Sequence, residues 1–209
     1  MCGRRRGLVR WLDPPPAGTR VCGGFDGASV DDWTAIKLET VDGLLFTPRY
    51  GRDARPTIWN PADWGGRTPR GEVQAAWEEI NDRYLLERVY LDPPHFGSEI
   101  AAWQQQFGDD VFIPWETYRA KQMFDALELF FTDITSGTLT HDGCPVTTLH
   151  VGNARTVGRS GKYGLDKASK TQKIDAGVTS VLAHKAAVDA RASGWGHEEP
   201  VDTRVFCFT

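Results

Sequence analysis

The chain has 209 residues, 40% of them hydrophobic and 25% charged, and its formal net charge is −4 at pH 7. That size allows one packed domain with a tail, and the overall charge does not by itself indicate a nucleic-acid binder. No stretch approaches the roughly 18 apolar residues of a membrane span, and the four cysteines include no CxxC pair of the kind that holds structural zinc. The basic start lacks the apolar run of a secretory signal, so we expect a soluble, cytosolic protein with free thiols.

The first part of the chain is predicted to form a tail and then three strands. Residues 1–18 combine the basic run Arg4–Arg6 with the stiff Pro14–Pro16 run, which is typical of a linker. Short apolar runs predict strands at Arg20–Asp26, Thr34–Glu39 and Gly43–Pro48. The Asp42-Gly43 pair is a signal for a tight hairpin turn, and residues 57–68 are rich in Pro, Gly and Trp, as expected of a loop.

The remainder alternates helices with short strands. Apolar residues at helical spacing predict helices at Pro69–Leu86, Gly97–Phe107, Thr117–Ile134, Cys144–Ala154 and from about Thr171 to Ala192. The runs "RVYLDPP" and "DVFIPW" predict two further strands, and residues 194–209 are expected to form a C-terminal tail. This order indicates an α/β fold over residues 19–193, with helices flanking a mixed central β-sheet.

Three acidic residues stand where expected strands end or where the last helix begins. Asp26 closes the first strand, Asp92 closes the fourth, and Asp175 lies in the first turn of the last helix. Sites in α/β sheets form at the carboxyl ends of neighbouring strands, so adjacent first and fourth strands would bring Asp26 and Asp92 together. Taken singly, each Asp also has a purely local explanation. Asp at a strand end often forms a turn, and Asp in the first turn of a helix is favoured by the helix dipole.

Three carboxylates at one place repel and raise one another's pKa unless a cation neutralises them. Oxygen ligands with few His or Cys nearby favour Mg²⁺ or Mn²⁺ over zinc. Two such ions about 4 Å apart activate a water and stabilise the leaving oxygen in phosphodiester hydrolysis. We therefore expect Asp26 to bridge two ions, with Asp92 and Asp175 each holding one of them.

Residues 155–173, before Asp175, form a basic stretch in which Asp166 is the one acid. Beside a phosphodiester site, we expect this stretch to be a mobile loop or hairpin with few apolar anchors, which contacts DNA phosphates. The alternative is a solvated surface loop. The candidate DNA-binding residues are Arg155, Arg159, Lys162, Lys167, Lys170 and Lys173.

The segments "GFDGASVDDWTAI", "VYLDPPHF", "HDGCPVTTLHVGNAR" and "QKIDAGVTSVLAHKAA" resemble the nuclease domain of the terminase large subunit of tailed bacteriophages, closest to the actinobacterial phage type. The resemblance covers the chain from about residue 19 to residue 192. It implies an RNase H-like fold and a two-metal endonuclease that cuts concatemeric viral DNA during genome packaging. The family's three acidic positions fall on Asp26, Asp92 and Asp175, and Asp32 matches a further acid near the metals.

The resemblance also implies partners and a place of action. They are double-stranded DNA, a packaging ATPase, the small terminase subunit and the portal, without a membrane, in the cytoplasm of the infected bacterial host. The chain departs from the family in one respect, because it has no GxxxxGK[ST] loop: "GRSGKYG" has the wrong spacing and no Ser or Thr after Lys162. We therefore expect a nuclease without the ATPase motor, either an excised domain or a separately encoded half.

Two other functions fit the same residues. An RNase H-like nuclease of another role, such as a junction resolvase or a ribonuclease, would use the same carboxylates, whereas a non-catalytic docking module of the packaging motor would need none of them. Among other groups, His95, His141 and His184 are weaker candidates for proton transfer, since a lone His is more often structural. Trp77 and Trp103 lie on apolar helix faces and are expected in the core.

Overall fold

The structure, a computed structural model, describes residues 10–196 apart from positions 160 and 170; the side chain of Arg159 also lies outside the described part. The strands are β1 Arg20–Asp26, β2 Thr34–Thr40, β3 Leu44–Phe46, β4 Arg49–Tyr50, β5 Arg55–Pro56, β6 Ile58–Trp59, β7 Leu85–Leu91, β8 Phe112–Pro114, β9 Thr140–His141, β10 Ala154–Arg159 and β11 Lys162–Lys167. The helices are the 3-10 turn η1 Pro61–Trp64, then α1 Arg70–Arg83, α2 Gly97–Phe107, α3 Ala120–Ser136, α4 Pro145–Asn153 and α5 Asp175–Ala192.

A mixed seven-stranded sheet forms the centre, in the order β8-β7-β1-β2-β3-β9 with β6 beside β2. The hairpin that the Asp42-Gly43 pair predicts is present, because β2 and β3 pair antiparallel with Gly43 in the left-handed region. The pairs β1–β7 and β7–β8 are parallel, as expected for strands joined through helices. The predicted mixed α/β class is confirmed.

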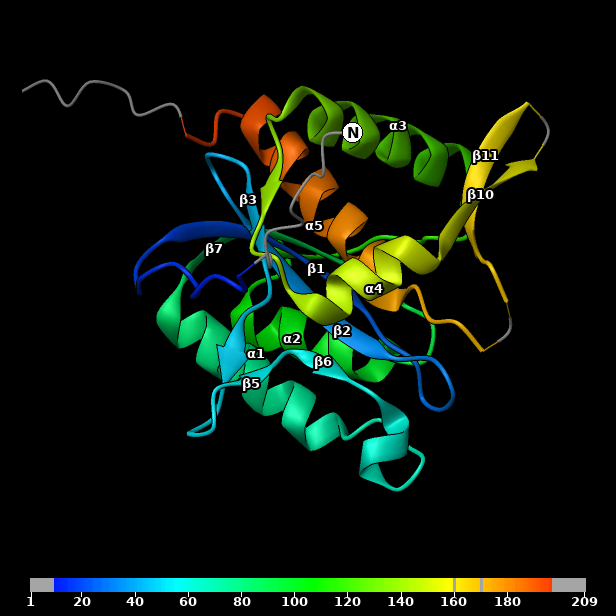
Figure 1. Ribbon diagram of the computed structural model, residues 1–209. Helices are drawn as coiled ribbons and strands as arrows, with labels where there is room; N and C mark the ends of the chain where they lie inside the picture. Colours follow the sequence, from blue (N-terminus) through cyan, green and yellow to red (C-terminus); the bar gives the residue numbers. More distant parts are fainter. Residues whose placement is uncertain (1–9, 160, 170, 197–209) are drawn as a thin grey trace, which may run out of the picture.

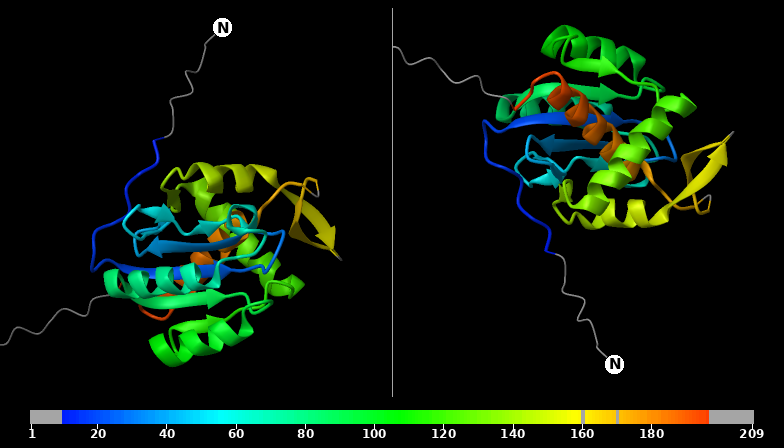
Figure 2. Two further views of the ribbon diagram at one scale, coloured as in Figure 1. Left: turned by 90° about the horizontal axis from the view of Figure 1, so that it is seen from below. Right: turned by 90° about the horizontal axis from the view of Figure 1, so that it is seen from above.

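Helices cover both faces of the sheet (Figure 1). α1 and α2 pack on one face, in a core that includes Trp77 and Trp103, so the predicted burial of these two tryptophans is confirmed. α3 and α5 pack on the other face around Leu127 and Leu182. β10 and β11 pair only with each other and project from the body as a hairpin (Figure 2).

Three predicted helix boundaries are wrong by three residues or more. α1 ends at Arg83 rather than Leu86, because Leu85–Leu91 pairs with β1 as the strand β7. α3 begins at Ala120 rather than Thr117, and α5 begins at Asp175 rather than Thr171. Thr117, just before α3, and Lys173, just before α5, form contacts in the site described below. The short strands β4, β5, β6 and β9 were not expected, because two residues give no readable periodicity.

Residues 10–18 lie against the domain. Trp11 Nε1 donates to Asp142 Oδ2 at 3.1 Å, and the backbone N–H of Gly18 donates to the Arg83 carbonyl at 2.7 Å. The expected boundaries at residues 18 and 194 stay predictions.

Cys22 and Cys144 are buried free thiols, and Cys2 and Cys207 lie outside the described residues. Among the described helices, none has the length and apolar character that crossing a membrane requires.

Candidate active site

Asp26 and Asp92 stand at the ends of two neighbouring parallel strands. β1 and β7 pair with Phe25 opposite Leu91, and the backbone N–H of Asp92 donates to the carbonyl oxygen of Phe25 at 3.0 Å. The predicted adjacency of the first and fourth strands is therefore confirmed. Both carboxylates therefore lie at the carboxyl ends of neighbouring parallel strands, where the sites of α/β folds form.

Asp175 reaches the same edge because α5 lies directly on β1. A Cβ on Gly24 would stand 2.5 Å from the backbone nitrogen of Ala183 and from the carbonyl oxygen of Thr179, so this approach requires glycine. Asp175 lies one turn before Thr179, toward the end of β1 that carries Asp26. The helix thus brings its first carboxylate to the ends of the strands.

The charge of Asp26 is unfavourable in these surroundings. Removal from water is the largest cause, and repulsion by Asp92, Asp175 and Asp32 adds to it, while Lys167 opposes. Together these effects raise the pKa of Asp26 well above its ordinary value. A carboxyl group held in this way either keeps a proton or binds a cation.

Asp92 is buried and oriented by Thr117, a residue that the sequence analysis did not single out. The Thr117 backbone N–H donates to Oδ1 at 3.1 Å, and its hydroxyl donates to Oδ2 at 2.7 Å. Burial raises the pKa of Asp92, the two bonds from Thr117 lower it, and the neighbouring Glu116 raises it again, with a net increase. Thr117 therefore fixes the direction of the carboxylate while its burial still favours a cation or a proton.

Asp175 is 7% exposed and has one oxygen without a partner. Its Oδ2 is buried and accepts no hydrogen bond from the described part of the chain. Burial and repulsion by Asp32 raise its pKa, while the backbone N–H groups of Asp175 itself and of Trp33 lower it. A buried oxygen without a donor is costly unless a cation or water meets it.

These observations test whether the residues suit a divalent metal. The possible ligand atoms are the carboxylate oxygens of Asp26, Asp92 and Asp175, and their negative charges repel one another. One of these oxygens, Oδ2 of Asp175, is buried without a hydrogen-bond donor. Both features fit Mg²⁺ or Mn²⁺. Among the described residues, no three Asp, Glu, His or Cys side chains already surround one point as ligands. Ion binding therefore requires Asp26 or Asp175 to turn, because Asp92 is held by Thr117 and each of its oxygens keeps a lone pair for an ion.

Asp32 has cationic partners at the rim of the cluster. Its Oδ1 accepts from Lys167, and from Lys173 at 2.9 Å, and its side chain is 41% exposed. These hydrogen bonds and charges outweigh desolvation and lower its pKa. Asp32, a candidate metal ligand, thus forms ion pairs with Lys167 and Lys173, two candidate DNA-binding residues. These ion pairs connect the base of the hairpin to the loop that follows β1.

The predicted basic segment forms the hairpin β10–β11, which is one of the two expected forms. Arg155 is exposed on β10, and Lys162 begins β11 half-buried. Lys170 and the side chain of Arg159 lie outside the described residues. Arg155 stands opposite Asp166 near the base of the hairpin, and Lys162 lies near its tip; we call these two residues the hairpin pair. The other described cations of the segment, Lys167 and Lys173, are held by Asp32.

The expectation of few apolar anchors is wrong for this hairpin. The ring of Tyr163 packs edge-on against Phe124 of α3 at 5.0 Å, and its hydroxyl donates to Glu128. Leu165 also packs against the core beneath α3. Alternate residues of a strand face the same side, so Tyr163 and Leu165 attach one face of β11 to the body.

The three weaker histidine candidates lie in different settings. His95 is exposed in the left-handed region and close enough to lower the pKa of Asp92. The Nδ1 atom of His141 accepts from the Gly143 N–H. His184 is buried between Glu39 and Asp133, at 2.9 and 3.0 Å, away from the three carboxylates.

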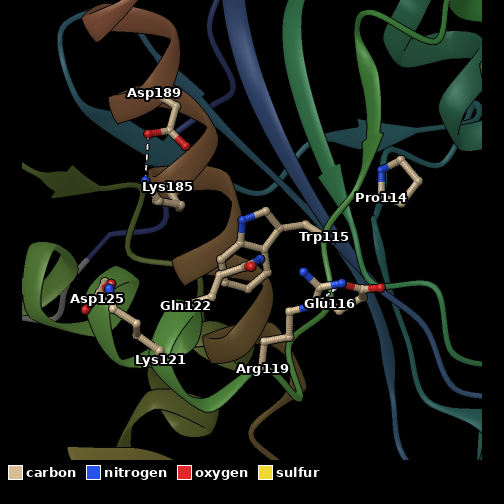
Figure 3. Close-up of a pocket in the computed structure, with 9 residues that line it drawn as sticks. All are labelled: Pro114, Trp115, Glu116, Arg119, Lys121, Gln122, Asp125, Lys185 and Asp189. Carbon is tan, nitrogen blue, oxygen red and sulfur yellow. Dashed lines mark hydrogen bonds and ion pairs between the residues drawn. The ribbon is translucent and has the colours of Figure 1, made fainter.

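A cleft of about 620 Å³ opens beside the segment that carries Thr117. Figure 3 shows its lining, with the Lys185–Asp189 ion pair on α5 and the ring of Trp115 beneath. Arg119 pairs with Glu116 and Lys121 with Asp125, so the three cations of this cleft are matched by three acids. The cleft therefore has little net charge to offer a phosphate backbone, unlike the hairpin pair Arg155 and Lys162.

Asp26→Asn should stabilise the metal-free protein. A carboxyl whose pKa is raised on folding makes the ionised form unfavourable at pH 7, and an amide of the same shape removes that charge. We expect the free energy of unfolding to rise by about 1 kcal/mol, or about 2–4 °C in Tm. Thermal unfolding in EDTA measures this. The difference in Tm between the variant and wild type should shrink as the pH falls through the raised pKa of Asp26, because wild-type Asp26 then takes up a proton and loses its charge. A variant with a lower Tm than wild type at pH 7 would contradict the inferred repulsion among the carboxylates.

Comparison with solved structures identifies the fold. The large terminase nuclease of thermophilic phage G20c with bound magnesium matches with a TM-score of 0.59 and 16% identity, over 87% of this chain and 89% of that one. The large terminase of bacteriophage HK97 matches with a TM-score of 0.59 and 18% identity, over 84% of this chain and 41% of that one. The chain has the fold of phage large-terminase nuclease domains, which confirms the resemblance and the RNase H-like class.

Sequence comparison adds a mycobacterial phage protein. The Gene 13 protein of Mycobacterium phage D29 is 30% identical over 192 residues, which are 85% of this chain and 31% of that protein. The chain thus spans about a third of the length of this relative. No protein-family model matches the chain. The source of the relative agrees with the predicted actinobacterial phage type.

Proposed function

We propose that this chain is a divalent-metal-dependent DNA endonuclease that cuts concatemeric viral DNA during genome packaging. The observation that carries the proposal is the crowding of Asp26, Asp92 and Asp175 at one sheet edge of a terminase-nuclease fold. Each of these carboxyls has a raised pKa, so each gains from a cation at pH 7. Crowded acids in a site are a functional signal when the fold gives them no cationic partner.

The three carboxylates have separate tasks in this proposal. Asp26, which both of the others repel, would be shared by the two ions, and Asp92 and Asp175 would each hold one of them. Two divalent ions supply an activated water and charge stabilisation of the leaving oxygen in phosphodiester hydrolysis. Thr117 keeps Asp92 aimed, and the orphaned Oδ2 of Asp175 is the acceptor atom that an ion would complete.

The ligand chemistry favours Mg²⁺ or Mn²⁺. All the proposed donors are carboxylate oxygens, which hard cations prefer. The G20c terminase nuclease was solved with bound magnesium and also with bound cobalt. Those ions belong to a protein of the same fold, and they support the proposal that Asp26, Asp92 and Asp175 bind a divalent cation.

The hairpin is proposed to hold the duplex. Arg155 and Lys162 would meet phosphates, while Lys167 and Lys173 keep the base of the hairpin next to the acids. Phosphate contacts carry little sequence information, so cutting by this chain alone should show weak sequence preference. A packaging ATPase, a small terminase subunit and a portal are the proposed partners, in the cytoplasm of the infected host.

Supercoiled plasmid should be nicked and linearised in Mg²⁺ or Mn²⁺ and left intact in EDTA. Gel electrophoresis of the products over time measures this. The substrate should be an ordinary duplex, so a four-way junction or an RNA–DNA hybrid should be cut no faster than DNA duplex of equal length. An inert protein would favour a docking module, and a preference for junctions or hybrids would favour another RNase H-like role.

A further inference from the structure

The start of α5, which carries Asp175, has no cap of its own. Its N-cap residue is Ile174, which has no side chain that can accept a hydrogen bond. The first backbone N–H groups of a helix need acceptors from elsewhere, and a helix end buried without them is unstable. The N–H of Ala176, next to Asp175, would be such an orphan.

His150 of α4 supplies the missing acceptor. Its Nδ1 accepts from the backbone N–H of Ala176 at 3.1 Å, across 26 positions of sequence. His150 is 1% exposed, so the bond is shielded from water. Since Nδ1 accepts, the ring carries its proton on Nε2; burial and the nearby Lys173 lower the pKa of His150 to about 4, which keeps the ring neutral at pH 7.

The same ring also touches the loop that reaches Asp175 from the other side. The ring of Trp33 packs edge-on against His150, with centroids 4.9 Å apart. The backbone N–H of Trp33 is one of the two groups that lower the pKa of Asp175 by hydrogen bonding. His150 therefore contacts both segments that surround Asp175, the helix start and the loop after β1.

We propose that His150 is a positioning residue of the metal site, whose Nδ1 holds the first turn of α5 so that the Asp175 carboxylate faces Asp26. The inference rests on the proposed function, since it assigns His150 a role through a ligand of that site. It concerns the neutral ring as an acceptor at one stated atom and gives it no part in proton transfer. Groups that orient metal ligands commonly change metal affinity or activity by about 10–100-fold when removed.

The choice of substitutions separates this role from ordinary core packing. His150→Asn keeps an acceptor atom at the δ position, whereas His150→Gln moves it one bond farther out, and His150→Leu removes it. His184→Gln is the matched control, because His184 is an equally buried histidine farther along α5 that pairs with Glu39 and Asp133. Loss of packing alone would affect all of these variants in proportion to their stability.

The test is calorimetric titration of Mn²⁺ into the full chain, together with thermal unfolding. We expect His150→Leu and His150→Gln to bind Mn²⁺ about 10–100-fold more weakly, His150→Asn to stay within about threefold of wild type, and His184→Gln to keep wild-type affinity despite a lower Tm. If His150→Leu does not fold, the Asn and Gln pair decides. Equal affinity in wild type and His150→Gln, or equal loss in the Asn and Gln variants, would overturn the proposal. A wild-type chain that neither binds Mn²⁺ nor cleaves DNA would instead overturn the proposed function.

Discussion

Asp26→Asn should abolish plasmid cleavage while leaving the fold intact. The amide keeps the shape of the carboxylate but loses the charge that would bind both ions, and Asp26 is the acid that both of the others repel. Several kcal/mol of charge stabilisation depend on such ions, so we expect the rate to fall by about 10³-fold or more. The same variant should unfold at a higher temperature than wild type in EDTA, so a loss of activity through unfolding is readily distinguished.

Asp31→Asn is the matched control for this variant. Asp31 lies five residues away in the same loop region, is exposed, and adopts a positive φ that asparagine tolerates. It should retain wild-type cleavage, because it does not belong to the cluster that raises the pKa of Asp26. Full activity in Asp26→Asn, measured as the rate of loss of supercoiled plasmid in Mn²⁺, would rule out the two-metal proposal.

The sequence predicts the backbone placement of the site well because that placement follows from local patterns. The apolar runs that end at Asp26 and Asp92 are strands, and parallel pairing of neighbouring strands puts their ends together. The last helix carries Asp175 because its apolar spacing is strong, although its first turn could not be located to better than four residues. Each of these inferences needs only the residues next to the acid.

The groups that orient the acids were missed because nothing local marks them. Thr117 lies 25 positions after Asp92, and His150 lies 26 positions before Ala176, so each bond exists only once the chain is folded. The apolar spacing of residues 117–134 includes Thr117 in the predicted helix, and nothing in that pattern indicates a bond to Asp92. In "GCPVTTLH", His150 suggests at most a partner for a Cys144 nucleophile, which we discount because no Asp or Asn partner is evident. A single His has no periodicity that would indicate burial.

The hairpin shows the same division. Its basic composition predicted a place beside the acids, but the pairing of Asp32 with Lys167 and Lys173 joins residues more than 130 positions apart. Composition alone also suggested a loose segment, whereas Tyr163 and Leu165 attach β11 to α3. Two apolar residues at alternate positions are enough to anchor one face of a short strand, and so short a signal is easily lost in a polar sequence.

Arg155→Ala combined with Lys162→Ala should weaken DNA binding and flatten its salt dependence. Among the described residues, ion pairs hold Lys167 and Lys173 to Asp32 and none involves Arg155 or Lys162, so the hairpin pair keeps its charge for phosphates. Each phosphate contact releases condensed counterions, so two lost contacts should reduce the slope of log affinity against log salt by about two. Binding of a plain duplex, measured in Ca²⁺ across a range of salt concentrations, gives this slope where cleavage should be slow.

Arg119→Ala combined with Lys121→Ala is the control, because it removes the same net charge from the cleft of Figure 3, where both cations are already paired with acids. Its salt slope should match that of wild type. Lys167→Ala combined with Lys173→Ala should change the slope less than substitution of the hairpin pair does, since those lysines already neutralise Asp32. An unchanged slope in the Arg155→Ala, Lys162→Ala double variant would show that the hairpin does not touch DNA. The basic run Arg4–Arg6, outside the described residues, would then be the next candidate for holding the duplex.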